Sequence, residues 1–186
     1  MGVSTYIGSR FFHRTATGRG VRAHVVAHRT DSATNLHREV KEFYNGLPPQ
    51  LQPSISASNA RELIFDRLQS VYKVSSAEGG DVGRSDDTHL LHMSEAGFFD
   101  NSEDLSSGLM KTVLDIPNTE IIIESTGNGA SGMFFDMCEQ AHRDKNKGLW
   151  RLHFLPWTYM PENKQEPPVG WQPPKEFADY ARLHSL

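Results

Sequence analysis

The sequence predicts an α/β fold in which a mostly parallel sheet lies between two layers of helices. Three observations predict it: dense apolar runs suited to buried strands, amphipathic stretches suited to helices, and the alternation of the two along the chain. The 186 residues are enough for one domain of ordinary size with a buried core. A hydrophobic content of 37% and a charged content of 23% are typical of a folded chain.

The first part of the chain is predicted to run helix, strand, helix. An amphipathic helix is expected over residues 4–17, ended by Gly18, and a buried strand over residues 21–27. Asp31 is expected to cap a second helix that ends near Tyr44.

The middle of the chain is predicted to add three short strands, over residues 54–57, 62–65 and 70–75. Residues 78–87 form a loop rich in glycine and aspartate, which we expect to be too polar to pack. The alternation then resumes, with elements at the following positions: a strand ending at Glu95, a helix near 103–114, a strand at 119–124, a helix over 130–145 and a last strand at 150–155.

A change of composition divides the chain at Pro156. More than half of the ten prolines lie from that residue onward, and a proline-rich segment cannot maintain the hydrogen bonds of a sheet. We therefore expect one domain over residues 1–155 and, over residues 156–186, a tail that restarts as helix from Glu176.

Bulk properties exclude several classes of protein. A net charge of -4 gives no whole-chain indication of nucleic-acid binding, and a basic stretch near the start is more typical of solvated helix surface than of a polyanion site. The single Cys138 excludes an internal disulfide and is expected in the core, and no zinc-binding spacing occurs. No segment is long and apolar enough for a signal peptide or a membrane span, so a soluble, cytoplasmic protein is expected.

Glu95 is the leading candidate for catalysis. It follows an apolar strand, and in open α/β sheets the carboxyl ends of the strands face the ligand crevice. In nucleotide hydrolysis such a glutamate would orient and partly deprotonate the attacking water. His92 and Ser94 are expected to bring polar atoms beside it, and a small polar neighbour would help to hold magnesium. The alternative is an ordinary surface glutamate, the commonest fate of this residue type.

A second polar segment, Glu-Ser-Thr-Gly-Asn-Gly at residues 124–129, follows another buried strand. The side chains of Ser125, Thr126 and Asn128 can contact a γ-phosphate or its water, and the glycines allow the backbone to shift when that contact is lost. The same segment offers a rival interpretation. Three glycines spell the G-x-G-x-x-G dinucleotide fingerprint, namely Gly127, Gly129 and Gly132, but the acidic residue required at the end of the next strand is missing, so nicotinamide binding is a minor alternative.

Two further positions suit a phosphate site. The segment Gly-Val-Ser-Thr at residues 2–5 opens a helix, where free N–H groups and the helix dipole favour an anion, although a plain helix-capping serine is the alternative. A phosphate-binding loop would carry lysine where Val3 stands. Arg84, in a polar loop, could neutralise charge during phosphoryl transfer, and a solvated arginine is an equal alternative.

These segments occur in a recognisable order. Gly-Val-Ser-Thr-Tyr-Ile-Gly at residues 2–8, Leu-Leu-His-Met-Ser-Glu-Ala-Gly-Phe-Phe at 90–99, Ile-Glu-Ser-Thr-Gly-Asn-Gly at 123–129 and Phe-Leu-Pro-Trp at 154–157 resemble the large terminase subunit of tailed bacteriophages. That family packages viral DNA into preformed heads with an amino-terminal ATPase motor and a carboxyl-terminal RNase H-like nuclease. The resemblance implies a sheet of the P-loop NTPase (RecA-like, ASCE) type.

The resemblance also implies roles for the candidate residues. Gly2, Ser4 and Thr5 would meet the phosphates of ATP, with Ser4 also contacting Mg²⁺, and Glu95 would be the catalytic carboxylate. Ser94 stands where the family usually has the aspartate of its magnesium-binding motif, and would contact the ion instead.

Movement and assembly are implied as well. Ser125, Thr126 and Asn128 would couple hydrolysis to movement, and Arg84 looks like the arginine that in some members reaches a neighbouring subunit's nucleotide. The implied partners are double-stranded viral DNA, the portal protein, the small terminase subunit and, for a full-length protein, further copies in a homo-oligomeric ring. The implied location is the bacterial host cytoplasm, transiently at the prohead portal.

The sequence departs from the family pattern at both ends. The family's phosphate loop begins earlier, after an interior strand that this sequence lacks, and the acidic residues of the nuclease are absent. We therefore expect a fragment of the motor domain, from a split or degraded prophage gene, that hydrolyses ATP poorly by itself. The alternative is a non-catalytic remnant that binds terminase partners through its helices.

Overall fold

The computed structural model describes residues 2–59, 61–78, 82, 87–100, 102–156, 159–160, 162 and 168–183. Its internal contacts separate Gly2–Leu152 from a second unit that contains His153–Leu186. The second unit contains one described helix, α5 (Lys175–Leu183), which is the helix expected after the proline-rich segment. Within the described residues, no helix is both long enough and apolar enough to cross a membrane.

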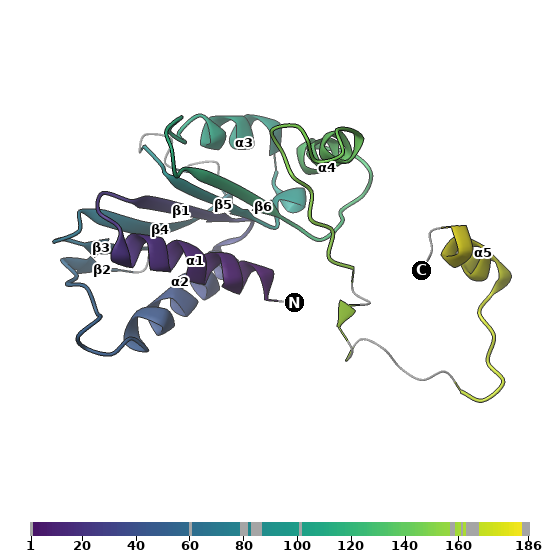
Figure 1. The fold of residues 1–186 in the computed structure, drawn as a ribbon, viewed down its shortest axis with the longest axis horizontal. Coiled ribbons are helices and arrows are strands. Elements are labelled where there is room, and N and C mark those ends of the chain that lie inside the picture. The colour runs from purple at the N-terminus through teal and green to yellow at the C-terminus, as the bar shows by residue number, and fades with distance from the viewer. Residues whose placement is uncertain are drawn as a thin grey trace. The chain divides into compact units, whose positions relative to one another are not determined.

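The larger unit is built on a six-stranded sheet with the strand order β2-β3-β4-β1-β5-β6 (Figure 1). The four strands from β4 to β6 pair in parallel, whereas β2 and β3 are antiparallel additions. The predicted α/β class with a mostly parallel sheet is therefore confirmed. The strands are β1 (Arg22–Ala27), β2 (Ala57–Ser58), β3 (Glu62–Phe65), β4 (Ser70–Ser76), β5 (Leu90–Ser94) and β6 (Glu120–Glu124).

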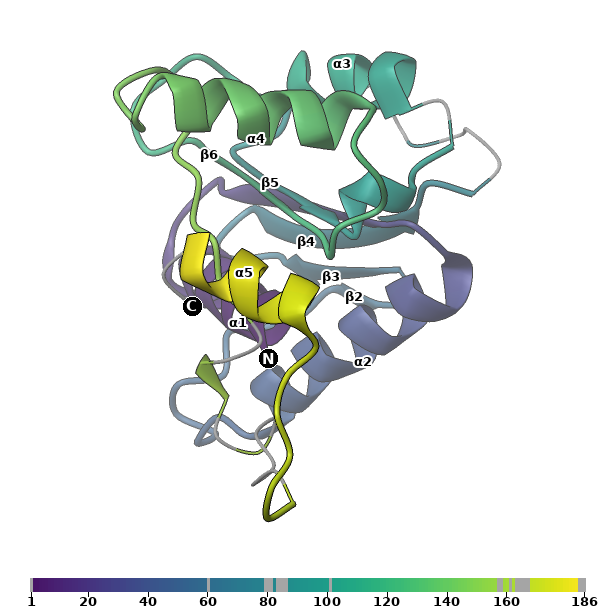
Figure 2. The same cartoon turned by 90° about the vertical axis from the view of Figure 1, so that its right-hand side faces the viewer.

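Helices cover both faces of this sheet. Figure 1 and Figure 2 show α1 (Val3–Thr17) and α2 (Thr30–Asn45) on one face, and α3 (Ser102–Met110) and α4 (Met133–Arg143) on the other. Two core clusters follow from this arrangement, because alternate residues of a strand point to opposite faces. Val25 of β1 packs with Phe11 of α1, whereas its neighbour Val26 packs with Leu109 of α3.

The first helix ends where predicted. The N–H of Gly18 donates to the carbonyl of Arg14, and a Cβ at this position would lie 2.6 Å from that oxygen and 2.7 Å from Val21. Only glycine fits so close an approach, so the chain turns here into β1.

Two expectations were wrong, one about the cap of the second helix and one about the loop that follows Glu78. The second helix is capped by Arg29 rather than by Asp31, which lies in its first turn, and the carboxylate of Glu78 accepts hydrogen bonds from the N–H and hydroxyl of Thr30. A carboxylate supplied by a distant loop therefore satisfies the helix start. The loop after Glu78 does pack in part, because Val82 is 1% exposed within the second core cluster.

The remaining differences concern one predicted strand that does not form and the bounds of three other elements. Residues 150–155 form no strand, and Phe154 and Leu155 are exposed, because an isolated apolar segment finds no neighbouring strand with which to pair. The second strand lies at 57–58 rather than 54–57. The later helices are shorter than predicted, since α3 ends at Met110 and α4 begins at Met133.

Candidate active site

The carboxyl ends of β5 and β6 lie side by side. Ser94 pairs with Glu124 in the parallel ladder, so the residues that follow, Glu95 and Ser125, leave the sheet at the same edge. The start of α1 lies at this edge too, because the hydroxyl of Ser4 donates to Glu124 at 2.8 Å. Three segments that are distant in sequence therefore meet here.

Glu95 is half-buried and contacts the segment that follows β6. One of its carboxylate oxygens, Oε2, lies 3.3 Å from the hydroxyl of Ser125, from the N–H of Thr126 and from the hydroxyl of Thr126. The backbone of Glu95 has a φ of 58°, in the left-handed region that few residues other than glycine adopt. Neighbouring interactions must hold a conformation of this kind, which is common at functional sites.

A second set of contacts ties the same two segments together. The N–H of Gly97 donates to the hydroxyl of Ser125 at 3.1 Å, and the side-chain amide of Asn128 donates to the carbonyl of Gly97 at 2.8 Å. A Cβ on Gly97 would lie 2.9 Å from the Ser125 oxygen, so a side chain here would displace the Ser125 hydroxyl from these contacts. Ser125 thus accepts from one residue of the turn after β5 and donates to another.

The start of α1 provides unpaired N–H groups. Gly2 caps the helix with a φ of 85°, no side chain caps it, and its first turn contains no acidic residue. The first N–H groups of any helix lack intrahelical acceptors, and the helix dipole makes this end favourable for an anion. Thr5 is exposed, whereas Ser4 is turned toward Glu124 and Val3 packs against the first core cluster.

Glu124 is the last residue of β6, and the sequence predicted no role for it. Its carboxylate accepts hydrogen bonds from Ser4 at 2.8 Å and from Nε2 of His92 at 3.3 Å, and the hydroxyl of Ser94 also interacts with it. Burial by itself would raise the pKa of Glu124, but the hydrogen bonds from His92, Ser94 and Ser4 outweigh burial and lower the pKa below its usual value. This half-buried side chain therefore carries its negative charge at neutral pH.

His92 lies in a different place from the one expected. Its side chain is 1% exposed and faces Glu124 rather than Glu95, and its ring meets Phe11 edge-on at a centroid distance of 6.3 Å. Alternate residues of β5 point to opposite faces, which places His92 on the α1 side of the sheet. The register of β5 against β6 pairs His92 with Ile122 and Ser94 with Glu124, so His92 and Glu124 are diagonal neighbours on one face of the sheet, and a single sequence does not disclose that register.

Comparisons with known proteins identify the fold. No family model matches the sequence, and none of the curated proteins matches it. Among solved structures, the HK97 bacteriophage large terminase matches with a TM-score of 0.61 and 18% identity, over 78% of this chain and 31% of that one. The large terminase ATPase domain of Thermus phage P74-26 matches with a TM-score of 0.53 and 18% identity, over 73% of this chain and 59% of that one.

The chain has the fold of a phage large-terminase ATPase domain. It covers 31% of the length of the HK97 terminase and 59% of the P74-26 domain. The dinucleotide alternative finds little support in this terminase fold, because the glycine-rich segment follows the edge strand β6 and no strand follows α4 within residues 144–156.

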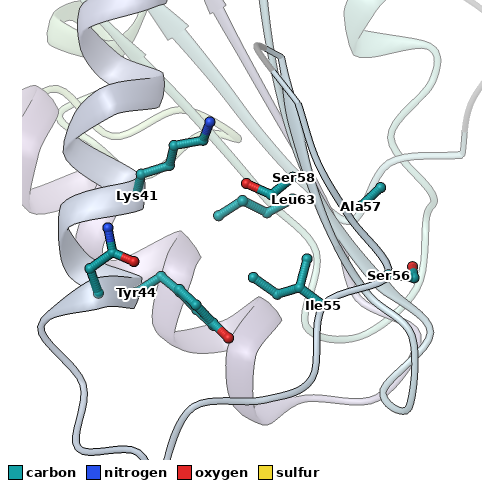
Figure 3. A pocket seen from close by; sticks show the side chains of 8 residues that line it. Lys41, Tyr44, Ile55, Ser56, Ala57, Ser58 and Leu63 are labelled. Carbon is teal, nitrogen blue, oxygen red and sulfur yellow. The ribbon is translucent and has the colours of Figure 1, made fainter.

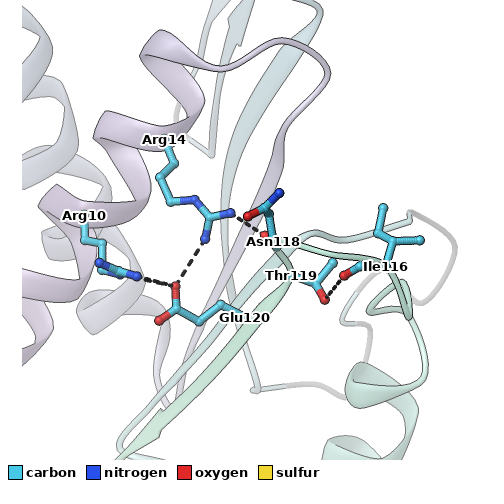
Figure 4. A network of polar contacts seen from close by, with 6 residues as sticks. All are labelled: Arg10, Arg14, Ile116, Asn118, Thr119 and Glu120. Atoms are coloured by element: carbon cyan, nitrogen blue, oxygen red, sulfur yellow. Dashed lines mark hydrogen bonds and ion pairs between the residues drawn. The ribbon is translucent and has the colours of Figure 1, made fainter.

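Three arginines bear on the candidate site and its surroundings. Arg84 lies outside the described residues. Arg10 and Arg14 of α1 both form ion pairs with Glu120 of β6, at 3.1 Å and 3.2 Å, and Arg14 also donates to the carbonyl of Asn118 (Figure 4). Both arginines lie in the basic stretch near the start of the chain, and both attach α1 to the edge of the sheet.

The described residues hold no group of three or more His, Cys, Asp or Glu side chains that could bind a metal ion by themselves. A pocket of about 370 Å³ lies elsewhere, between the end of α2 and the strands β2 and β3, and Lys41, Tyr44 and Leu63 are among its lining residues (Figure 3). None of the predicted site residues that the structure describes lines this pocket. The predicted residues Ser4, Ser94, Glu95 and Ser125 lie instead at the edge formed by the ends of β5 and β6 and the start of α1.

Proposed function

We propose that this chain is part of the ATPase motor of a phage DNA-packaging large terminase, with ATP bound at the edge formed by Gly2, Ser4, Thr5 and Glu95. The observation that carries the proposal is the contact of Glu95 with Ser125 and Thr126. A carboxylate at the end of one strand and hydroxyl groups at the end of the next are suited to binding a phosphate and its attacking water.

Each group has a distinct task in this proposal. The N–H groups at the start of α1 bind phosphate oxygens, with the helix dipole adding to the attraction. Glu95 orients a water molecule and accepts its proton. Ser125 and Thr126 hold the Glu95 carboxylate, and Asn128 holds the turn at Gly97, so a change at Glu95 is transmitted to the segment that leads into α4.

The residues present also fit a magnesium ion. Ser4 and Ser94, the two hydroxyl groups predicted to contact it, both lie against the carboxylate of Glu124, which gives the all-oxygen set of donors that Mg²⁺ prefers. Magnesium bound with ATP would supply positive charge that offsets the charge of the phosphates. We propose ATP and Mg²⁺ as the cofactors on this basis.

The partners follow from the proposed motor function. They are double-stranded viral DNA, the portal protein and the small terminase subunit, with further copies of the chain in a ring. Arg84 would act between copies in such a ring, and the assembly would work in the cytoplasm of the bacterial host.

The test is magnesium-dependent release of phosphate from ATP by the chain and two variants. Glu95→Gln keeps the size of the side chain and removes its charge, so we expect the weak turnover of the parent chain to fall to background. Glu103→Gln, at an exposed position in the first turn of α3, should leave turnover unchanged. Equal turnover in Glu95→Gln and the parent would remove Glu95 from its role.

A chain without turnover would direct attention to partner binding. If it then bound the portal protein or the small terminase subunit equally well with and without ATP, the non-catalytic alternative would replace the motor proposal.

A further inference from the structure

We infer that Glu124, at the end of β6, supplies the carboxylate that holds the magnesium ion of the bound nucleotide. The inference rests on the proposed ATP-binding function and assigns one more residue to the same site. Magnesium usually binds through one or two carboxylates, the phosphates and several waters, so the site needs at least one acidic residue beside the hydroxyl groups.

Glu124 lies beside the two hydroxyl groups predicted to contact magnesium, and this position is the first argument for the inference. In P-loop NTPases the ion is held by a hydroxyl group at the start of the helix after the phosphate loop and by an acidic residue at the end of a strand. Here β5 ends in Ser94, which offers a hydroxyl group but no charge. The residue paired with Ser94 in the ladder is Glu124, whose carboxylate accepts a hydrogen bond from Ser4.

The other carboxylate at this edge is engaged differently. Glu95 is held by Ser125 and Thr126, on the side of the turn that follows β6. Glu124 lies instead against the first turn of α1, where the N–H groups for phosphate are found. The two carboxylates can therefore divide the work, Glu95 serving the water and Glu124 the cation.

Glu120 and Glu124, both in β6, differ in their surroundings, and the difference favours cation binding by Glu124 over attachment of α1. Glu120 lies on the same face of the same strand and is neutralised by the two arginines that fix α1. The hydrogen bonds to Glu124 come from the hydroxyl of Ser4 and the imidazole of His92, and the hydroxyl of its ladder partner Ser94 also stabilises its charge. Hydroxyl oxygens can bind a cation along with the carboxylate, and a histidine behind a carboxylate ligand fixes its orientation.

The experiment measures how much magnesium tightens the binding of a fluorescent ATP analogue. Its dissociation constant is determined by anisotropy in excess EDTA and again in excess Mg²⁺, and the ratio gives the gain due to the ion. Glu124→Gln should reduce this gain by about tenfold or more. In EDTA the substitution should not weaken binding, because it removes a negative charge near the phosphates. Glu120→Gln is the matched control, because it weakens the attachment of α1 without touching the proposed site, and should keep the full gain.

A second variant moves the carboxylate across the ladder. Ser94→Asp combined with Glu124→Ser keeps one acid and one hydroxyl group at the paired positions, and should retain most of the gain. This double variant also decides the matter if Glu124→Gln does not fold, as judged by circular dichroism.

The outcomes distinguish a failure of the inference about Glu124 from a failure of the proposed ATP binding. A full magnesium gain in Glu124→Gln, an equal loss in Glu120→Gln, or a folded double variant without any gain would overturn the inference alone, as would a parent chain that binds the analogue equally with and without Mg²⁺. A parent chain that binds no analogue in either condition would overturn the proposed function and this inference with it.

Discussion

The Glu95 carboxylate lies 3.3 Å from the hydroxyl group of Thr126, although 31 positions separate the two residues in the sequence. Parallel pairing of β5 with β6 produces this contact, because the two strands end at the same edge of the sheet. The relationship makes several parts of the account open to measurement.

Gly97 should be intolerant of a side chain. In Gly97→Ala the new Cβ would lie 2.9 Å from the Ser125 oxygen, so the Ser125 hydroxyl must move and its hydrogen bonds with Gly97 and Glu95 are disturbed. We expect the free energy of unfolding in urea to fall by about 1–3 kcal/mol. Gly127→Ala is the control, since nothing lies within 4 Å of its Cβ position and a change within about 0.5 kcal/mol is expected. Equal effects of the two substitutions would contradict the packing described.

The Arg14–Glu120 pair should contribute modestly and in a salt-dependent way. The two side chains are 25% and 29% exposed, so solvent screens the pair in part. A double-mutant cycle of Arg14→Gln and Glu120→Gln should give a coupling of about 0.5–1 kcal/mol at low salt, decreasing as salt is added. A coupling of zero at low salt would show that this ion pair does not help to attach α1 to β6.

Acid should remove the contribution of Glu78 to stability. Hydrogen bonds from the N–H and hydroxyl of Thr30 lower the pKa of Glu78. A group with a lowered folded-state pKa stabilises the fold above its unfolded pKa, about 4.3 for glutamate, and the effect is lost as the pH falls through the folded-state pKa. The melting temperature of the parent should exceed that of Glu78→Gln at neutral pH, and the difference should vanish in acid.

Glu42→Gln provides the control for this measurement, because Glu42 is exposed near the opposite end of α2. A difference between parent and Glu78→Gln that grows as the pH falls would have the wrong sign for the assigned contact.

Val82 should behave as a core residue despite its polar surroundings in the sequence. It is 1% exposed, so Val82→Ala should reduce the free energy of unfolding by about 1–3 kcal/mol through lost burial and a cavity. Val169, which is fully exposed, is the matched position where the same substitution should have no effect. No loss of stability in Val82→Ala would mean that the loop does not pack on the second core cluster.

Much of the site could be predicted because it follows from local pattern and one rule of topology. The apolar strand before Glu95 and the one before Ser125 are visible in the sequence, and parallel strands bring their carboxyl ends together. The pairing of Ser94 with Glu124 could not be predicted, because register is set by contacts between distant segments.

The other misses have the same origin. The carboxylate at the start of α2 comes from Glu78, 48 positions beyond Thr30, whereas the local sequence indicated Asp31 as the cap. The apolar run at 150–155 had the composition of a strand but no partner in the sheet. The polar residues around Val82 in the sequence gave no indication of its burial, since burial depends on where a loop passes rather than on its composition.

The central claim is that ATP binds at the edge shared by β5, β6 and the start of α1, and an NMR titration with ATP and Mg²⁺ tests it most directly. The account predicts that backbone amide shifts change first at residues 2–5, 94–97 and 124–128, while the amides around the pocket of Lys41 and Tyr44 stay constant. Shift changes confined to that pocket, or none at saturating ATP, would contradict it.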